Sequence, residues 1–317
     1  MKGNEMFRTA FDYCCGVLCI VTLATAAMAQ ESSVLPGVPV HMVVTVEARH
    51  GKQVPVINKE DVMVYQGKDR DQVTDWVPLQ GDKAALDLYI LLDDGSTFSL
   101  GSQLDDIRNF INAQPATTRI GIAYMQNGVA QIVRDLTNDH AAAGRALRLP
   151  MGSPGINGSP YFSLEDLIKR WPEGSARREV LMATDGVDRF YGPGPDDPYV
   201  STAVEQAQRA GIVVYAIYTP GVGHFGHSYW STYWGQIYLS QIAAETGGEG
   251  YYIGFTGPPV AFAPYLDSVS AHLTNQHLLT FLAKPEKKAG LQRVRLATEV
   301  PNADLVGAHS IWVPAGQ

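Results

Sequence analysis

The chain reads Leu88-Tyr89-Ile90-Leu91-Leu92-Asp93-Asp94-Gly95-Ser96-Thr97 within its first third. Five apolar residues in a row predict a short strand that is buried on both faces, as in a parallel sheet. The polar residues that follow fall at the carboxyl-terminal end of that strand, where open α/β sheets bind their ligands. Carboxylate and hydroxyl oxygens suit a divalent cation, but Asp, Gly, Ser and Thr are also ordinary turn residues. This stretch alone leaves a cation site and a plain turn open.

Strands and helices are predicted to alternate from Leu86 onward, which indicates a doubly wound α/β fold. After the first strand, further strands are predicted at residues 119–125, 129–136, 179–183, 212–218 and 251–253. Helices are predicted after the N-caps Ser99, Asp139, Ser163 and Asp197, and at residues 236–245 and 260–275. We therefore expect a mostly parallel sheet with helices on both faces.

The two ends of the chain are predicted to be β-structure without crossover helices. The expected strands are residues 40–46, 62–65 and 73–77 at one end and 278–283, 292–298 and 310–313 at the other. Each end alone has too few strands for a stable sheet, and chain termini often lie close together. We expect the N- and C-terminal segments to form one small antiparallel β module.

This pattern predicts four divisions of the chain. They are a signal peptide at 1–29, an N-terminal β segment at 30–82, an α/β domain at 83–276 and a C-terminal β segment at 277–317 that packs with the N-terminal one.

The first 29 residues have the composition of a secretory signal peptide. Lys2 and Arg8 give a basic start, residues 14–27 are almost wholly apolar, and Ala27-Met28-Ala29 is a small-x-small cleavage site. The apolar run is short for a membrane span. We expect an exported protein, periplasmic or secreted, with no membrane span in the mature chain; an uncleaved N-terminal anchor is the alternative.

Composition excludes several classes of function. The net charge of −8 and the absence of a Lys/Arg-rich run argue against a nucleic-acid partner. All three cysteines lie inside the predicted signal peptide, at Cys14, Cys15 and Cys19. The mature chain is therefore expected to have no disulfide, no zinc–thiolate site and no cysteine nucleophile.

Three loops are expected at one edge of the predicted sheet. They contain Asp93-Asp94-Gly95-Ser96-Thr97, Asn157-Gly158-Ser159-Pro160 and Thr184-Asp185-Gly186. On these motifs the sequence resembles a von Willebrand factor type A domain. Over residues 38–315 it is similar to exported bacterial proteins of this family that carry β segments before and after the type A domain.

The resemblance implies a metal-ion-dependent adhesion site (MIDAS). The family writes this site as Asp-x-Ser-x-Ser, completed by a Thr and an Asp from two further loops. The matching residues here are Asp93, Thr97, Ser159 and Asp185. They would hold Mg²⁺ or Mn²⁺, with one position open to an acidic side chain of a protein partner.

The sequence departs from this motif at Gly95, which stands where the family has its middle serine. The departure removes one hydroxyl ligand, which water can replace because Mg²⁺ commonly keeps several waters. A register that uses Asp94 and Ser96 keeps the serine but puts Phe98 at the last hydroxyl position. A degenerate site without metal is the alternative.

The resemblance implies a binding or adhesion module rather than an enzyme, and no catalytic residue is predicted. No nucleophile elbow, phosphate-binding glycine loop or Ser–His–Asp set is visible in the sequence. One alternative is a Mg²⁺-dependent, phosphatase-like hydrolase with Asp93 as nucleophile. Its pattern would be Asp-x-Asp-Gly-Thr, whereas this chain has Asp-Asp-Gly-Ser-Thr. Another alternative is a structural envelope module with a decayed metal site.

An aromatic segment at residues 221–235 is predicted to follow the strand at 212–218 and to lie on the same edge. Aromatic residues are enriched at binding hot spots. We therefore expect a partner-binding loop that includes His224, His227, Trp230 and Trp234. The alternative is that these aromatic side chains cover the sheet edge as part of the core.

Overall fold

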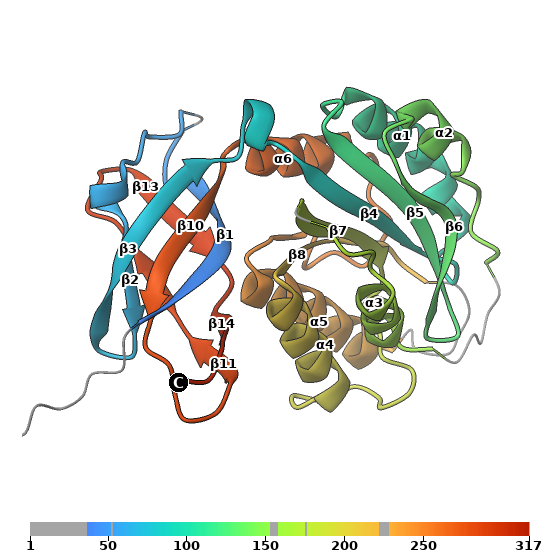
Figure 1. Ribbon diagram of the computed structural model, residues 1–317. Coiled ribbons are helices and arrows are strands. Elements are labelled where there is room, and N and C mark those ends of the chain that lie inside the picture. The colour runs from blue at the N-terminus through green and yellow to red at the C-terminus, as the bar shows by residue number, and fades with distance from the viewer. Residues whose placement is uncertain (1–36, 52, 153–157, 175, 222–227, 317) are drawn as a thin grey trace, which may run out of the picture. The chain divides into compact units, whose positions relative to one another are not determined.

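The apolar run of residues 88–92 lies in strand β4 (Leu86–Asp93), in which every residue is buried. The computed structural model describes residues 37–51, 53–152, 158–174, 176–221 and 228–316, and all of these belong to one unit, Leu35–Gln317. The predicted signal peptide lies outside the described residues. Strand β4 is central in a six-stranded sheet (Figure 1) with β5 (Thr118–Gln126), β6 (Val129–Thr137), β7 (Arg177–Thr184), β8 (Ile212–Tyr218) and β9 (Gly250–Tyr251).

The order of these strands confirms the predicted doubly wound fold. The sheet runs β6-β5-β4-β7-β8-β9. Counted in chain order within the sheet, this is 3-2-1-4-5-6, the order of doubly wound dinucleotide-binding folds. Strands β4, β5, β7, β8 and β9 are parallel, and only β6 is antiparallel to its neighbour β5.

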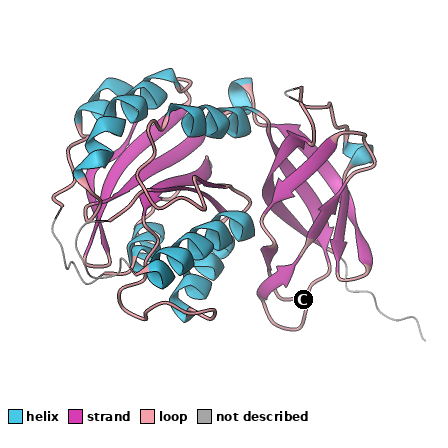
Figure 2. Cartoon of the chain, turned by 180° about the vertical axis from the view of Figure 1, so that it is seen from behind, coloured by secondary structure: helices cyan, strands magenta, loops and turns pink. Residues whose placement is uncertain are grey.

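Helices cover both faces of this sheet (Figures 1 and 2). Leu88 and Ile90 point to one face, where they pack in one core with α1 (Leu104–Ala113), α2 (His140–Arg145) and α6 (Ala263–Thr274). Tyr89 and Leu91 point to the other face and pack with α3 (Pro160–Lys169), α4 (Pro198–Ala210) and α5 (Tyr229–Thr246). The apolar run is unbroken because alternate residues of a strand point to opposite faces and both faces are buried. None of the described helices is long and apolar enough to cross a membrane.

The N- and C-terminal segments pair with each other, as predicted. Val38 of β1 lies opposite Ala283 of β10 in an antiparallel ladder. One sheet has the order β12-β2-β3-β10-β1-β13, and a second pairs β11 with β14. The strands are β1 (Val38–Ala48), β2 (Met63–Gln66), β3 (Asp69–Pro78), β10 (Gln276–Ala283), β11 (Gly290–Arg293), β12 (Arg295–Ala297), β13 (Ala303–Gly307) and β14 (Ser310–Val313). Short 3₁₀ helices lie at η1 (Lys59–Asp61), η2 (Gly81–Lys83) and η3 (Phe98–Gln103).

Several predicted helix starts are wrong. Ser99 lies inside η3, and α1 begins only at Leu104. Helix α3 begins at Pro160 instead of after Ser163, because Ser159 caps it and accepts a hydrogen bond from the Tyr161 N–H. Helix α5 begins seven residues before the predicted Gln236. Strand β13 was not predicted at all.

Glu179 gives the fold a specific pH dependence. It is fully buried, and its Oε1 lies 3.5 Å from Nε of Arg177. Burial raises the pKa of Glu179 from its ordinary 4.5 to about 7, because Arg177 and Gln276 offset only part of the desolvation. The unfolded chain therefore loses this proton first, and stability falls as pH rises from 4.5 through 7.

We predict that the free energy of unfolding falls with rising pH by about 3 kcal/mol less in Glu179→Gln than in the wild type, because glutamine has no proton to lose. Urea unfolding of both proteins at pH 5 and pH 8 measures the difference. An unchanged pH dependence in the variant would contradict the raised pKa.

Candidate functional site

The sheet has its topological switch point between β4 and β7. Helix α1, which follows β4, lies on one face, and α4, which follows β7, lies on the other. A crevice for ligands is expected outside the carboxyl ends of the strands at such a point. Asp93 is the last residue of β4, and Asp185 directly follows β7. Two of the predicted site residues are thus at the edge where this fold binds ligands.

Asp93 is held by hydrogen bonds on both carboxylate oxygens. Its Oδ1 accepts from the Gly95 N–H at 2.7 Å, and its Oδ2 accepts from the Thr184 hydroxyl at 2.6 Å. Burial, together with the charge of Asp185, raises the pKa of Asp93 to about 6. The two bonds and the charge of Arg189 act in the opposite direction. Asp93 is therefore a buried acceptor within the protein.

Asp185 is paired with a cation that the sequence analysis missed. Nη2 of Arg189 lies 2.5 Å from Asp185 Oδ2. The other carboxylate oxygen accepts from the Val187 N–H at 2.9 Å. The Arg189 side chain is 17% exposed and the Asp185 side chain is 4% exposed.

Ser159 bonds to a second unpredicted residue, Asp188. Its hydroxyl donates to Asp188 Oδ2 at 2.8 Å. The other oxygen of Asp188 accepts from the N–H groups of Phe190 and Tyr191, at 2.7 and 3.0 Å. Ser159 therefore caps α3 and fastens the loop after β7 to the start of that helix.

Thr97 and Gly95 are tied to their own loop. The Thr97 hydroxyl bonds to the hydroxyl of Ser99, and the Thr97 N–H donates to the Pro220 carbonyl at 3.0 Å. A side chain at Gly95 would place its Cβ 3.1 Å from Asp93 Oδ1. A serine at position 95, as in the family motif, would therefore crowd the Asp93 carboxylate.

Asp94 has a structural partner outside the predicted ligand set. Its fully buried carboxylate receives two bonds from Arg148, at 2.6 and 2.7 Å, and one from the Met151 N–H at 3.0 Å. These donors lower the pKa of Asp94 despite its burial. The register that would use Asp94 as a metal ligand is therefore disfavoured.

These contacts do not fit a magnesium site. Mg²⁺ requires near-octahedral oxygen ligands, whereas Asp93, Asp185, Ser159 and Thr97 each bond to groups of the protein. No cluster of three or more His, Cys, Asp or Glu side chains suited to a metal occurs among the described residues. Binding of Mg²⁺ or Mn²⁺ stays a prediction from the resemblance.

The predicted aromatic loop is in part a helix. Residues 229–235 form the first turns of α5, and Ser228 caps it by accepting from the Ser231 N–H. Trp230 is 62% exposed, whereas Trp234 is half-buried and packs with the core between the sheet and α3–α5. His224 and His227 lie outside the described residues.

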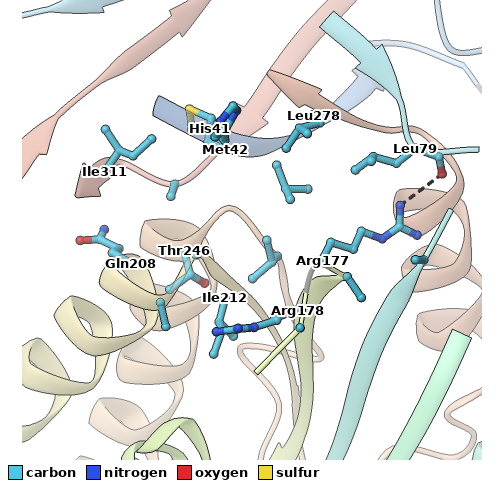
Figure 3. Close-up of a pocket in the computed structure, with 18 of the residues that line it drawn as sticks. His41, Met42, Leu79, Arg177, Arg178, Gln208, Ile212, Thr246, Leu278 and Ile311 are labelled. Carbon is cyan, nitrogen blue, oxygen red and sulfur yellow. Dashed lines mark hydrogen bonds between the residues drawn. The ribbon is translucent and has the colours of Figure 1, made fainter. Parts of the chain in front are cut away.

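A cavity of about 590 Å³ lies away from these residues, at the amino-terminal ends of β7 and β8 (Figure 3). Its lining includes Met42 of β1 and Ile212 of β8. Arg177 also lines it, but its guanidinium donates to the carbonyls of Leu79 and Leu273 at 3.3 and 3.1 Å. The Arg177 guanidinium is thus already hydrogen-bonded within the fold. The cavity contains none of the predicted site residues.

No protein-family model matches the chain. No curated protein matches it either. Among solved structures, it is similar to an aerotolerance-related membrane protein from Bacteroides fragilis NCTC 9343, with 13% identity, 59% of this chain and 98% of that chain covered, and a TM-score of 0.45.

Two further similar structures are named as type A domains. The SpRpn10 VWA domain is 12% identical, over 58% of this chain and 95% of that chain, with a TM-score of 0.38. The ArnB paralog VWA2 from Sulfolobus acidocaldarius is 6% identical, over 87% of this chain and 76% of that chain, also with a TM-score of 0.38.

Proposed function

We propose that this protein is a non-enzymatic binding module that docks a protein partner on the carboxyl-terminal edge of its type A-like sheet. The observation that supports this is a set of exposed aromatic side chains on segments that follow β4, β7, β8 and β9. They are Phe98, Phe190, Tyr191, Tyr229, Trp230, Tyr233 and Phe255. Exposed apolar patches and aromatic side chains are characteristic of protein interfaces.

One group of these side chains lies on the first turns of α5. Tyr229 and Trp230 are 71% and 62% exposed, and their rings meet edge to face with centroids 5.6 Å apart. Tyr233 stacks on Tyr229 at 6.3 Å. The three rings support one another, and Tyr229 and Trp230 keep most of their surface in solvent. Such rigid aromatic anchors bind with little loss of side-chain entropy.

A second group follows the neighbouring strand β7. Phe190 packs edge to face on Phe162 of α3 and on Tyr199 of α4, with centroids 5.4 and 5.5 Å apart. Phe190 itself stays largely exposed, as does Tyr191. The backbone of both residues is held by Asp188. The loop after β7 therefore presents its aromatic side chains from a fixed backbone.

A hydrolase is supported less well than a binding module. Its nucleophile would be Asp93, yet both oxygens of that buried carboxylate accept hydrogen bonds. A nucleophile must also be reached by its substrate, and this carboxylate is buried. Turnover of p-nitrophenyl phosphate that Asp93→Asn abolishes would favour the hydrolase over the binding module.

Trp230 and Trp234 form a matched pair for testing the exposed surface. We predict that Trp230→Ala leaves the free energy of unfolding within about 0.5 kcal/mol of the wild type, because its ring is already in solvent. Trp234→Ala should lose about 2 kcal/mol, because its half-buried ring packs on Tyr238. Urea unfolding measures both, and equal losses would assign Trp230 to the core.

A photo-cross-linking amino acid at Tyr229 tests partner docking directly. In the full chain, produced in its native host, we expect one predominant protein adduct at this position. The same cross-linker at Val56, which is 82% exposed before η1 in the N-terminal segment, is the control and should give no such adduct. Adducts that are the same at both positions would contradict docking at the sheet edge.

We keep the expectation, implied by the family resemblance, that the partner presents an acidic side chain. Export to the periplasm or the medium remains part of the proposal. It rests on the composition of residues 1–29.

A further inference from the structure

The Arg189 guanidinium lies among acidic groups of the sheet edge. It bonds to Asp185, and the charges of Asp185, Asp93 and Asp188 all raise its pKa against the effect of burial. In turn, Arg189 acts against the rise in the pKa of Asp93. A single side chain of the protein thus pairs with Asp185, one of the two aspartates that the family resemblance assigns to a metal ion.

A second i,i+4 pair in the same chain shows how unusual this environment is. Arg170 lies 2.5 Å from Asp166, the same separation as Arg189 from Asp185. The Arg170 and Asp166 side chains are 44% and 30% exposed. The Asp166 pair is therefore solvated, whereas the Asp185 pair is enclosed, where an unpaired carboxylate is much more costly.

The backbone after β8 closes over the enclosed pair. A Cβ added at Gly221 would lie 2.3 Å from Asp185 Oδ2 and 2.9 Å from Nη2 of Arg189. The bridge between Ser96 and Gly221 holds this segment against the loop after β4. Mg²⁺ usually keeps several of its waters in protein sites, and this close approach leaves little room for them beside Asp185.

We propose that Arg189 is the resident cation of this type A-like site and stands in the place of a divalent metal ion. The loss of the motif serine at Gly95 agrees with this exchange, because a guanidinium bonded to Asp185 needs no hydroxyl ligand from residue 95. The site is then closed to Mg²⁺ and Mn²⁺, and whatever binds at this edge does so without them.

Calorimetric titration and thermal melting of the full chain with MgCl₂ and MnCl₂, after treatment with EDTA, test the proposal. The wild type should give no heat beyond dilution and no change in Tm. Arg189→Ala should melt lower than the wild type without metal. It should then regain about 2–4 °C in Tm with MnCl₂, because its freed carboxylates bind the ion in the folded state only.

Arg170→Ala is the matched control, since it also frees an aspartate from an i,i+4 arginine; it should gain nothing from either ion. Arg189→Lys, which keeps a cation, should stay as insensitive to metal as the wild type.

Metal binding by the wild type would overturn the proposal even if Arg189→Ala did not fold. So would an Arg189→Ala protein that folds and ignores both ions. These measurements need no partner, so this inference and the proposed function can fail independently.

Discussion

Replacing Gly186 by alanine is expected to lower the free energy of unfolding by about 3 kcal/mol. Gly186 has φ +69°, in the left-handed region. An added Cβ would lie 2.3 Å from the Gly235 carbonyl oxygen and 2.6 Å from Cγ of Leu239. Gly235 belongs to α5, so the new methyl group would have to push the loop after β7 away from a packed helix.

Gly211→Ala separates backbone strain from this collision. Gly211 ends α4 with φ +64°, nearly the same conformation, but nothing lies within 4 Å of its added Cβ. We expect it to lose only about 1 kcal/mol, the strain of the left-handed backbone. Urea unfolding compares the two variants, and equal losses would show that the contact between Gly186 and Gly235 relaxes freely.

The close contact between Gly186 and Gly235 also determines how the loop that contains Asp185 packs on α5. Gly186 lies directly after Asp185, and its carbonyl accepts a hydrogen bond from the Tyr161 hydroxyl at 2.8 Å. The added Cβ of Gly235 would in turn lie 2.5 Å from the Asp185 carbonyl oxygen. Two glycines therefore let the loop after β7 approach α5 closely enough to enclose Asp185 and its arginine.

Local signals in the sequence were sufficient to predict helix starts and tight turns that depend on particular residue types. Asp197 followed by Pro198 predicted the start of α4, and the Asp197 carboxylate accepts from the Tyr199 N–H at 2.8 Å. Asn127 and Gly128 connect β5 to β6, and Asn-Gly is a sequence signal for a hairpin turn. They adopt φ values of 50° and 75°, as the turn of a two-residue hairpin requires.

Local signals failed where distant parts of the chain decide the structure. Strand β13 is short and mostly half-buried, and it forms by pairing with β1, so that Leu305 lies opposite Val46. The start of α5 combines aromatic residues of weak helix propensity with a serine cap, which reads equally well as a loop. No pattern within either segment distinguishes these outcomes.

The site was predictable in position but not in electrostatics. The topology brought Asp93 and Asp185 to one sheet edge, as expected from strands that end side by side. The partner of each carboxylate was not predictable, because Thr184 bonds to Asp93 from the neighbouring strand β7. Arg189 reaches Asp185 only through the turn after β7. A motif describes ligands of a metal, and it does not reveal a cation supplied by the chain itself.

Arg148→Met is expected to lower the free energy of unfolding by about 3 kcal/mol at pH 7, because it leaves the Asp94 carboxylate buried without its cation. Arg148 forms two bonds to Asp94 and lies 3.9 Å above the ring of Tyr124. Methionine preserves most of the aliphatic contact, so the loss should report on the charge. Urea unfolding measures it.

The pH dependence of that loss follows from the state of Asp94. In the wild type its pKa is lowered, so the pair stabilises the fold above the ordinary pKa of aspartate and loses this contribution as pH falls. In Arg148→Met the unpaired carboxyl should take up a proton more readily. The difference between variant and wild type should therefore shrink toward pH 4.

Two controls decide whether burial causes the effect. Lys284→Met breaks the exposed pair with Asp69, whose atoms lie 2.7 Å apart, and should change the free energy of unfolding by no more than about 0.5 kcal/mol. The double variant Asp94→Asn with Arg148→Met removes both charges and should lose less than Arg148→Met alone. A double variant that loses as much as the sum of its single variants would show that the two groups act independently, and that Asp94 holds the loop at Met151 through hydrogen bonds rather than through its charge.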